Sequence, residues 1–174
     1  EKIDQSTDIF NRLAKEYPNS SFIADTCFRL GEDQYQQKKY AAAIVQYQKA
    51  IGQKPTGELQ ENLLHKLGWA YYQQEKFTEA LGQFNEQLKR SPQGRLLQDG
   101  TFMQAESLFK LKKYEEALPA FEKLLDVELS SPLFQVLARL HAGQSAGQLK
   151  RWQESLAILE TIPKDFAKSS YLPE

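Results

Sequence analysis

The sequence predicts an all-α protein in which antiparallel helix pairs repeat every 37 residues. Three alanines carry the period, because Ala43, Ala80 and Ala117 follow one another at intervals of 37 residues. Residues 63–71 place apolar side chains at the i, i+3 and i+4 spacing of one helical face, and no segment argues for a sheet. Self-similarity at such a period is typical of stacked repeat proteins, so we expect a solenoid.

Other positions stay in register with these alanines, and a fourth copy has Ser155 in their place. Twelve residues earlier stand small residues, namely Gly31, Gly68, Ala105 and Gly143. Four residues later stand large ones, namely Tyr47, Phe84, Phe121 and Leu159. A small residue lets two helix backbones approach closely, and a large side chain fills the gap that remains. We therefore expect these positions to form the contact within each helix pair.

The clearest copy runs from Leu64 to Pro92. It carries, at fixed offsets, Leu67, Gly68, Tyr71, Ala80, Phe84 and Pro92. This pattern resembles the tetratricopeptide repeat, whose usual unit has about 34 residues. The resemblance implies a right-handed superhelical solenoid of antiparallel helix pairs, here with a 37-residue period. It also implies that the chain binds other proteins and is not an enzyme.

We expect one solenoid segment over residues 1–174. Its predicted parts are 1–18 (second helix of a truncated repeat), repeats at 19–55, 56–92, 93–129 and 130–167, and 168–174 (start of a further repeat). First helices are expected near 21–37, 58–74, 95–111 and 132–148. Second helices are expected near 40–53, 77–90, 115–127 and 152–161, after a lone helix within 3–17. Because both ends cut through the period, we expect the chain to be part of a longer protein.

Composition narrows the function. Twenty-two Lys and Arg balance 23 Asp and Glu. The net charge is therefore too small for the protein as a whole to attract nucleic acid electrostatically. No apolar run is long enough for direct membrane insertion. His65 and His141 lack companions at metal-ligand spacing, and Cys27 stands where the family often has a buried tryptophan. We therefore predict no catalytic residue, no metal site and no cofactor.

The resemblance implies a concave groove lined by the first helices. The residues expected to bind a partner there are Phe28, Arg29, Tyr35, Asn62, His65, Lys66, Trp69, Tyr72, Phe102, Met103 and Phe109. Exposed aromatic rings beside Arg and Lys are typical of protein-binding hot spots. For Tyr35, Tyr72 and Phe109 the alternative is that they fill space between adjacent first helices. Trp69 is the strongest binding candidate, since its position is not a core position of the motif.

We therefore predict a scaffold that binds a peptide or helix of a partner protein in this groove. Two alternatives remain, a regulatory module that senses a ligand or signal peptide, and a non-catalytic segment of a larger enzyme. Self-association through exposed terminal repeats is also compatible with the pattern. The phrase at 16–20, Glu-Tyr-Pro-Asn-Ser, and the 37-residue unit resemble bacterial envelope members of the Tol-Pal-associated and outer-membrane assembly types. That resemblance implies a periplasmic or envelope location, which composition alone leaves unknown.

Overall fold

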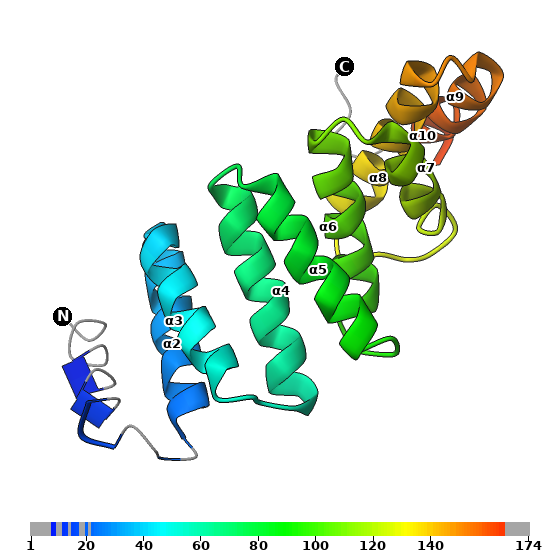
Figure 1. Cartoon of the computed structure of the whole chain (residues 1–174). Coiled ribbons are helices and arrows are strands. Elements are labelled where there is room, and N and C mark those ends of the chain that lie inside the picture. Colours follow the sequence, from blue (N-terminus) through cyan, green and yellow to red (C-terminus); the bar gives the residue numbers. More distant parts are fainter. Residues whose placement is uncertain (1–7, 10–11, 14, 18–19, 21, 166–174) are drawn as a thin grey trace. The chain divides into compact units, whose positions relative to one another are not determined.

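The computed structural model in Figure 1 describes residues 8–9, 12–13, 15–17, 20 and 22–165. Within these residues the regular structure is entirely helical and no strand occurs. Eight helices, α2 to α9, are packed in sequential pairs, which confirms the predicted all-α repeat fold. The predicted lone helix within 3–17 and the predicted start of a further repeat at 168–174 lie largely or wholly outside the described residues.

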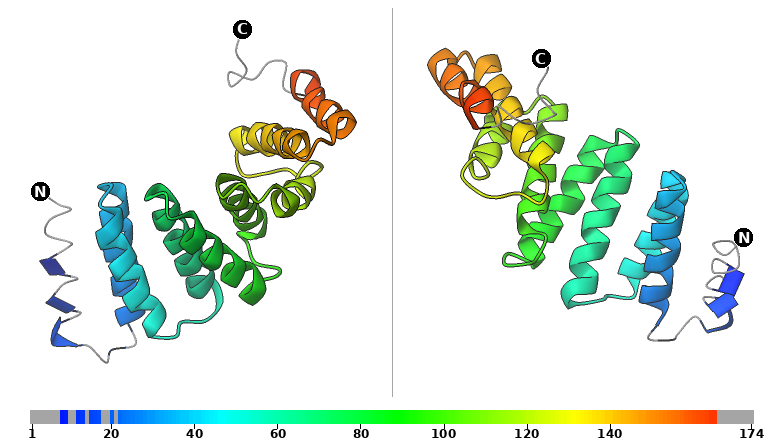
Figure 2. Two further views of the ribbon diagram at one scale, coloured as in Figure 1. Left: turned by 45° about the horizontal axis from the view of Figure 1, so that its top comes forward. Right: turned by 180° about the vertical axis from the view of Figure 1, so that it is seen from behind.

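The first compact unit contains two helix pairs and extends to Leu96. In one pair, α2 (Ile23–Gln36) is followed by α3 (Tyr40–Gly52), and in the next α4 (Gly57–Gln73) is followed by α5 (Phe77–Arg90). Figures 1 and 2 show the two helices of each pair side by side. A core of buried residues joins the pairs, because Leu63 and Leu67 of α4 belong to the same cluster as Tyr47 of α3.

The second compact unit begins at Leu97 and repeats this plan. It contains α6 (Leu97–Lys110), α7 (Tyr114–Glu122), α8 (Pro132–Gln148) and α9 (Trp152–Leu159), followed by the short α10 (Thr161–Asp165). Pro132 takes the first position of α8, where its missing N–H costs nothing. Helix α7 packs against both α6 and α8.

The small residues at the crossings are in contact with the large side chains of the partner helices. A Cβ atom added to Gly31 would lie 2.5 Å from the ring of Tyr47, and one added to Gly68 would lie 2.7 Å from the ring of Phe84. Both rings are fully buried. Because carbon atoms do not approach so closely without a bond, only glycine permits this packing. The predicted contact is confirmed in these two pairs, and also in the fourth, where a Cβ atom added to Gly143 would lie 2.5 Å from Leu159.

Each first helix ends in the same hydrogen-bonded motif. The residue after the C-cap has a positive φ, between 58° and 62°, at Lys38, Glu75, Lys112 and Lys150. In the first case the amide of Lys39 bonds to the carbonyl of Gln34, and that of Lys38 bonds to Tyr35. This pattern is a Schellman motif, and it turns the chain sharply into the second helix. Three of the four positive-φ residues are lysines, whose charge suits the negative end of a helix.

Helix α7 is shorter than the predicted 115–127, because it ends at Glu122. Pro119 lies inside it and removes one backbone hydrogen bond from a helix of only nine residues. Beyond Glu122 the chain continues in turns, and the carbonyl of Leu125 accepts a hydrogen bond of 2.7 Å from Arg139 of α8. The prediction for this helix was wrong at its end, and Arg139 of α8 binds a backbone carbonyl in the turns that take the place of its last residues.

The close packing inside the second pair can be tested at Ala80, whose side chain is fully buried in α5. Ala80→Leu should lower the free energy of unfolding by about 1–3 kcal/mol, because added methylenes must push the paired helices apart. Urea unfolding measures the change. The matched control is Ala41→Leu, since Ala41 is exposed on α3. Equal stability of the two variants would show that Ala80 is not at a close contact.

Candidate functional site

The first helices of unit 1 form a surface that we call the α2–α4 surface, defined by Glu32 and Tyr35 of α2 and by Lys66, Trp69 and Tyr72 of α4. All five side chains are half-buried. Tyr35, Lys66 and Trp69 line a shallow pocket of about 220 Å³, with His65 beneath them. The surface therefore combines aromatic rings with one acidic and one basic group.

Lys66 joins the two helices of this surface. Its Nζ lies 2.7 Å from Oε2 of Glu32 and 5.8 Å from the centre of the Tyr35 ring. The other oxygen of Glu32 accepts a hydrogen bond of 2.5 Å from the hydroxyl of Tyr47. Burial, together with the nearby Glu32 carboxylate, raises the pKa of Tyr47, so its hydroxyl stays a donor. The ring that packs on Gly31 thus also holds Glu32 in place.

A chain of hydrogen bonds runs from Trp69 into the core. The indole Nε1 of Trp69 donates to Nε2 of His65 at 3.0 Å, and Nδ1 of His65 lies 3.0 Å from Oε1 of Gln87. Because an indole N–H can only donate, Nε2 of His65 must accept, and its proton sits on Nδ1. Gln87 in turn donates to the carbonyl of Leu96 at 3.1 Å. This chain fixes the orientation of the Trp69 ring.

The aromatic residues near the ends of the first helices pack within their own pairs. Tyr35 meets Tyr40 at 5.2 Å between ring centres, Tyr72 meets Phe77 at 5.2 Å, and Phe109 meets Tyr114 at 5.7 Å. In unit 2, Phe109 is also stacked on His141 of the adjacent first helix, with ring centres 4.3 Å apart. Phe109 therefore fills space between adjacent first helices, as the alternative interpretation had it. Tyr35, in contrast, also lines the pocket of the α2–α4 surface.

Three of the residues expected in the groove are buried, and of these only His65 lines the pocket of the α2–α4 surface. Phe102 and Met103 are 2% and 1% exposed, and His65 is 6% exposed. Phe102 is stacked on Phe134 of α8 at 4.4 Å, so the packing of α8 against α6 covers the α6 side chains. The expectation that Phe102 and Met103 are accessible to a partner was therefore wrong.

The remaining predicted residues keep some exposure. Arg29 is exposed, whereas Phe28 and Asn62 are half-buried, and the ring of Phe28 lies 6.1 Å from that of Tyr47. In unit 2, Nδ1 of His141 lies 2.7 Å from Oε2 of Glu106.

Sequence reasoning missed Gln87, which is 1% exposed. The signal was its departure from the alanine that the family has at this position, because a buried amide needs hydrogen-bond partners.

Metal binding and thiol chemistry have little support among the described residues. They contain no cluster of three or more His, Cys, Asp or Glu side chains that could hold a metal ion. Cys27 is 2% exposed, and burial raises the pKa of its thiol, so the reactive thiolate is disfavoured. Among the same residues, no helix combines the length and apolar character that a bilayer crossing requires.

Two family models match the sequence. Residues 36–124 match the model described as "Anaphase-promoting complex, cyclosome, subunit 3". The complex in this description is a property of that family, and the match to this chain concerns its sequence. Residues 102–170 match the model described as "Tetratricopeptide repeat". No curated protein matches the sequence closely enough to identify a relative.

Solved structures share the fold at low sequence identity. The crystal structure of MamA has a TM-score of 0.78 and 16% identity, over 97% of this chain and 92% of that one. YrrB, described as a TPR protein with an unusual peptide-binding site, has a TM-score of 0.80 and 14% identity over 97% and 80%. A tetratricopeptide repeat protein from Parabacteroides merdae has a TM-score of 0.77 and 18% identity over 96% and 61%.

Repeated helix pairs with small residues at their crossings define a class of α-helical repeat domains that generally mediate protein–protein interactions. Within this class, the chain belongs to the tetratricopeptide repeat family. Domains of this family are typically non-catalytic. The envelope subtype expected from residues 16–20 is not supported by the matches.

The buried hydrogen-bond chain can be tested at Gln87. Gln87→Met keeps the length of the side chain but removes the hydrogen bonds that Gln87 makes with Nδ1 of His65 and with the carbonyl of Leu96. We expect the free energy of unfolding to fall by about 1–3 kcal/mol, the usual cost of an unsatisfied buried group. Gln83→Met is the control, because Gln83 is half-buried on the same helix. A Gln87→Met protein as stable as the control would contradict the chain.

Proposed function

We propose that the α2–α4 surface binds a peptide or a helix of a partner protein, with Trp69 and Tyr35 contacting an apolar side chain of that partner. The observation that carries this proposal is the hydrogen bond from Trp69 to His65, at 3.0 Å. It holds a half-buried indole in one orientation before any partner arrives. A fixed aromatic side chain costs little entropy on binding and is a common hot spot.

The charges beside the rings support the same proposal. Lys66 and Glu32 are paired, yet their side chains keep 36% and 26% of their exposure. In a partly exposed pair, Lys66 can donate and Glu32 can accept further hydrogen bonds with a partner, which fixes the direction of the partner. YrrB, which has the same fold, is described as carrying a peptide-binding site, so this architecture can bind a peptide.

The pocket of the α2–α4 surface is small for the alternative function, in which the protein senses a small ligand. Its volume of about 220 Å³ lies below the roughly 300–1,000 Å³ that is usual for small-molecule sites. A single side chain of a peptide fits such a volume, with the remaining contacts spread along the helices. The α2–α4 surface therefore favours a protein ligand over a free small molecule.

The experiment starts with peptides selected against the whole chain from a displayed random library. Trp69→Ala should weaken the selected peptides by about 30-fold or more, because truncating an aromatic hot spot costs about 2 kcal/mol. Isothermal titration calorimetry measures the affinity. Trp152→Ala, which removes the other tryptophan, on α9, should leave the affinity unchanged.

A second control separates binding from stability. Trp69→Ala also removes the hydrogen bond that Trp69 donates to Nε2 of His65, so it lowers stability as well. Gln87→Met loses the hydrogen bonds of Gln87 inside the core but leaves the Trp69 ring and its hydrogen bond to His65 in place. A folded Gln87→Met protein should therefore bind within about threefold of the parent. Peptides that bind folded Trp69→Ala as tightly as the parent would refute the proposal.

A further inference from the structure

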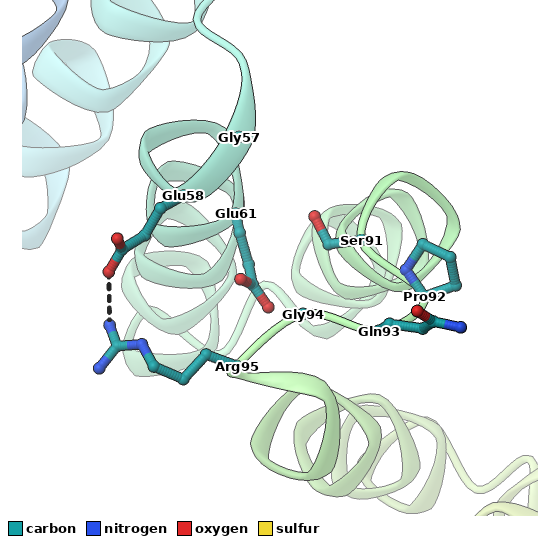
Figure 3. Close-up of a pocket in the computed structure, with 8 residues that line it drawn as sticks. All are labelled: Gly57, Glu58, Glu61, Ser91, Pro92, Gln93, Gly94 and Arg95. Carbon is teal, nitrogen blue, oxygen red and sulfur yellow. Dashed lines mark ion pairs between the residues drawn. The ribbon is translucent and has the colours of Figure 1, made fainter.

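A second pocket of unit 1 shares no residue with the α2–α4 surface. It has a volume of about 520 Å³ and lies between the N-terminal end of α4 and the 91–95 segment after α5 (Figure 3). Glu58 and Glu61 line it from α4, and Ser91, Gln93 and Arg95 line it from the other side. In Figure 3 the side chain of Glu61 points from the helix toward this segment.

Glu61 is an unusual residue to find in the lining of a pocket, because its side chain is acidic yet the residue is only 4% exposed. Oε1 accepts a hydrogen bond of 2.9 Å from the backbone N–H of Leu96. No further hydrogen bond or ion pair of this carboxylate occurs among the described residues. Oε2 is not one of the buried side-chain atoms that lack a partner, so it is open to the solvent of the pocket. A buried charge is costly unless it is paired, and one neutral amide compensates it only in part. The pocket thus contains an acceptor that lacks a cation.

The backbone of the 91–95 segment is shaped around this carboxylate. Gly94 lies so close to Glu61 that any side chain at this position would overlap the carboxylate. Gly57, at the start of α4, also lines the pocket and has a φ of 62°, a conformation that glycine adopts without strain. Gly94 thus lets the backbone of the 91–95 segment lie directly against the Glu61 carboxylate.

The rim of the pocket, formed by Glu58 and Arg95, already contains an ion pair between a carboxylate and a guanidinium group. Arg95 lies 3.1 Å from Oε1 of Glu58, and the two side chains are 69% and 71% exposed. An ion pair this exposed contributes little stability and can exchange with a cation from outside. Counting Glu58, Glu61 and Arg95, the pocket carries a net charge of −1 before any ligand enters.

We propose that this pocket binds the guanidinium group of an arginine side chain of a partner protein. The planar group presents five donors, which suit Oε2 of Glu61 and the Ser91 hydroxyl together, and it sheds water more easily than an ammonium group. A calcium ion would need six to eight oxygen ligands, and the described residues hold no cluster of three carboxylates here or elsewhere. An anion would meet two carboxylates against one arginine.

The proposal does not depend on the α2–α4 surface, and small probes test it directly. The probe is N-acetyl-L-arginine amide, and its neutral control is N-acetyl-L-citrulline amide, which has nearly the same shape. In ¹⁵N–¹H correlation spectra of the whole chain, the arginine probe should shift the backbone amides of Gly94 and Leu96 in a saturable way. The citrulline probe should not.

Three variants sharpen the result. Glu61→Gln keeps an oxygen for the Leu96 N–H but removes the charge, and it should weaken the arginine probe at least about tenfold. Arg95→Ala removes the competing guanidinium of the rim and should tighten the probe by about threefold or more. Glu79→Gln, an equal charge change at an exposed position of α5, should have no effect.

Several outcomes would overturn the proposal. These are equal shifts with the citrulline probe, unchanged binding in folded Glu61→Gln, looser or unchanged binding in Arg95→Ala, and an equal loss in Glu79→Gln. Circular dichroism checks that each variant is folded. If Glu61→Gln does not fold, Glu58→Gln on the exposed rim must weaken the probe by about threefold, and unchanged binding there would refute the site.

Discussion

Three of the four described helix pairs share one packing contact, in which a large side chain of the second helix lies against a glycine of the first. In the third pair Ala105 takes the place of the glycine. Tyr47 on Gly31 and Phe84 on Gly68 leave no room for even one methyl group. This contact sets how closely the paired helices approach, and the buried clusters follow from it. The 37-residue period is the spacing at which the chain repeats that contact.

The same contact reaches the candidate binding surface. Tyr47 packs on Gly31 with its ring and holds Glu32 with its hydroxyl, and Glu32 then holds Lys66. In the second pair, His65 lies beside the ring of Phe84, with ring centres 5.8 Å apart, and accepts the indole N–H of Trp69. The exposed groups are therefore oriented by residues whose positions the core determines, which is what a pre-organised site requires.

The sequence predicted the fold well because the small and large residues of each pair lie a fixed number of positions apart. Helices 57–73 and 132–148 fall within one residue of their predicted bounds. The end of α7 could not be predicted, since it depends on Arg139 from another helix. Phe102 and Met103 were placed by family position, which does not show what the neighbouring helix covers. The burial of Glu61 could not be predicted, because it depends on a segment about 30 residues away.

A double-mutant cycle between Gly68 and Phe84 tests the central claim most directly. Gly68→Ala alone should destabilise, although alanine favours helices by about 1 kcal/mol, and the same change at Gly82, with nothing within 4 Å, should stabilise. Once Phe84→Leu has removed the ring, Gly68→Ala should cost at least about 1 kcal/mol less than in the parent. Stability effects that add within about 0.5 kcal/mol would contradict the claim that the ring and the glycine determine how the helices pair.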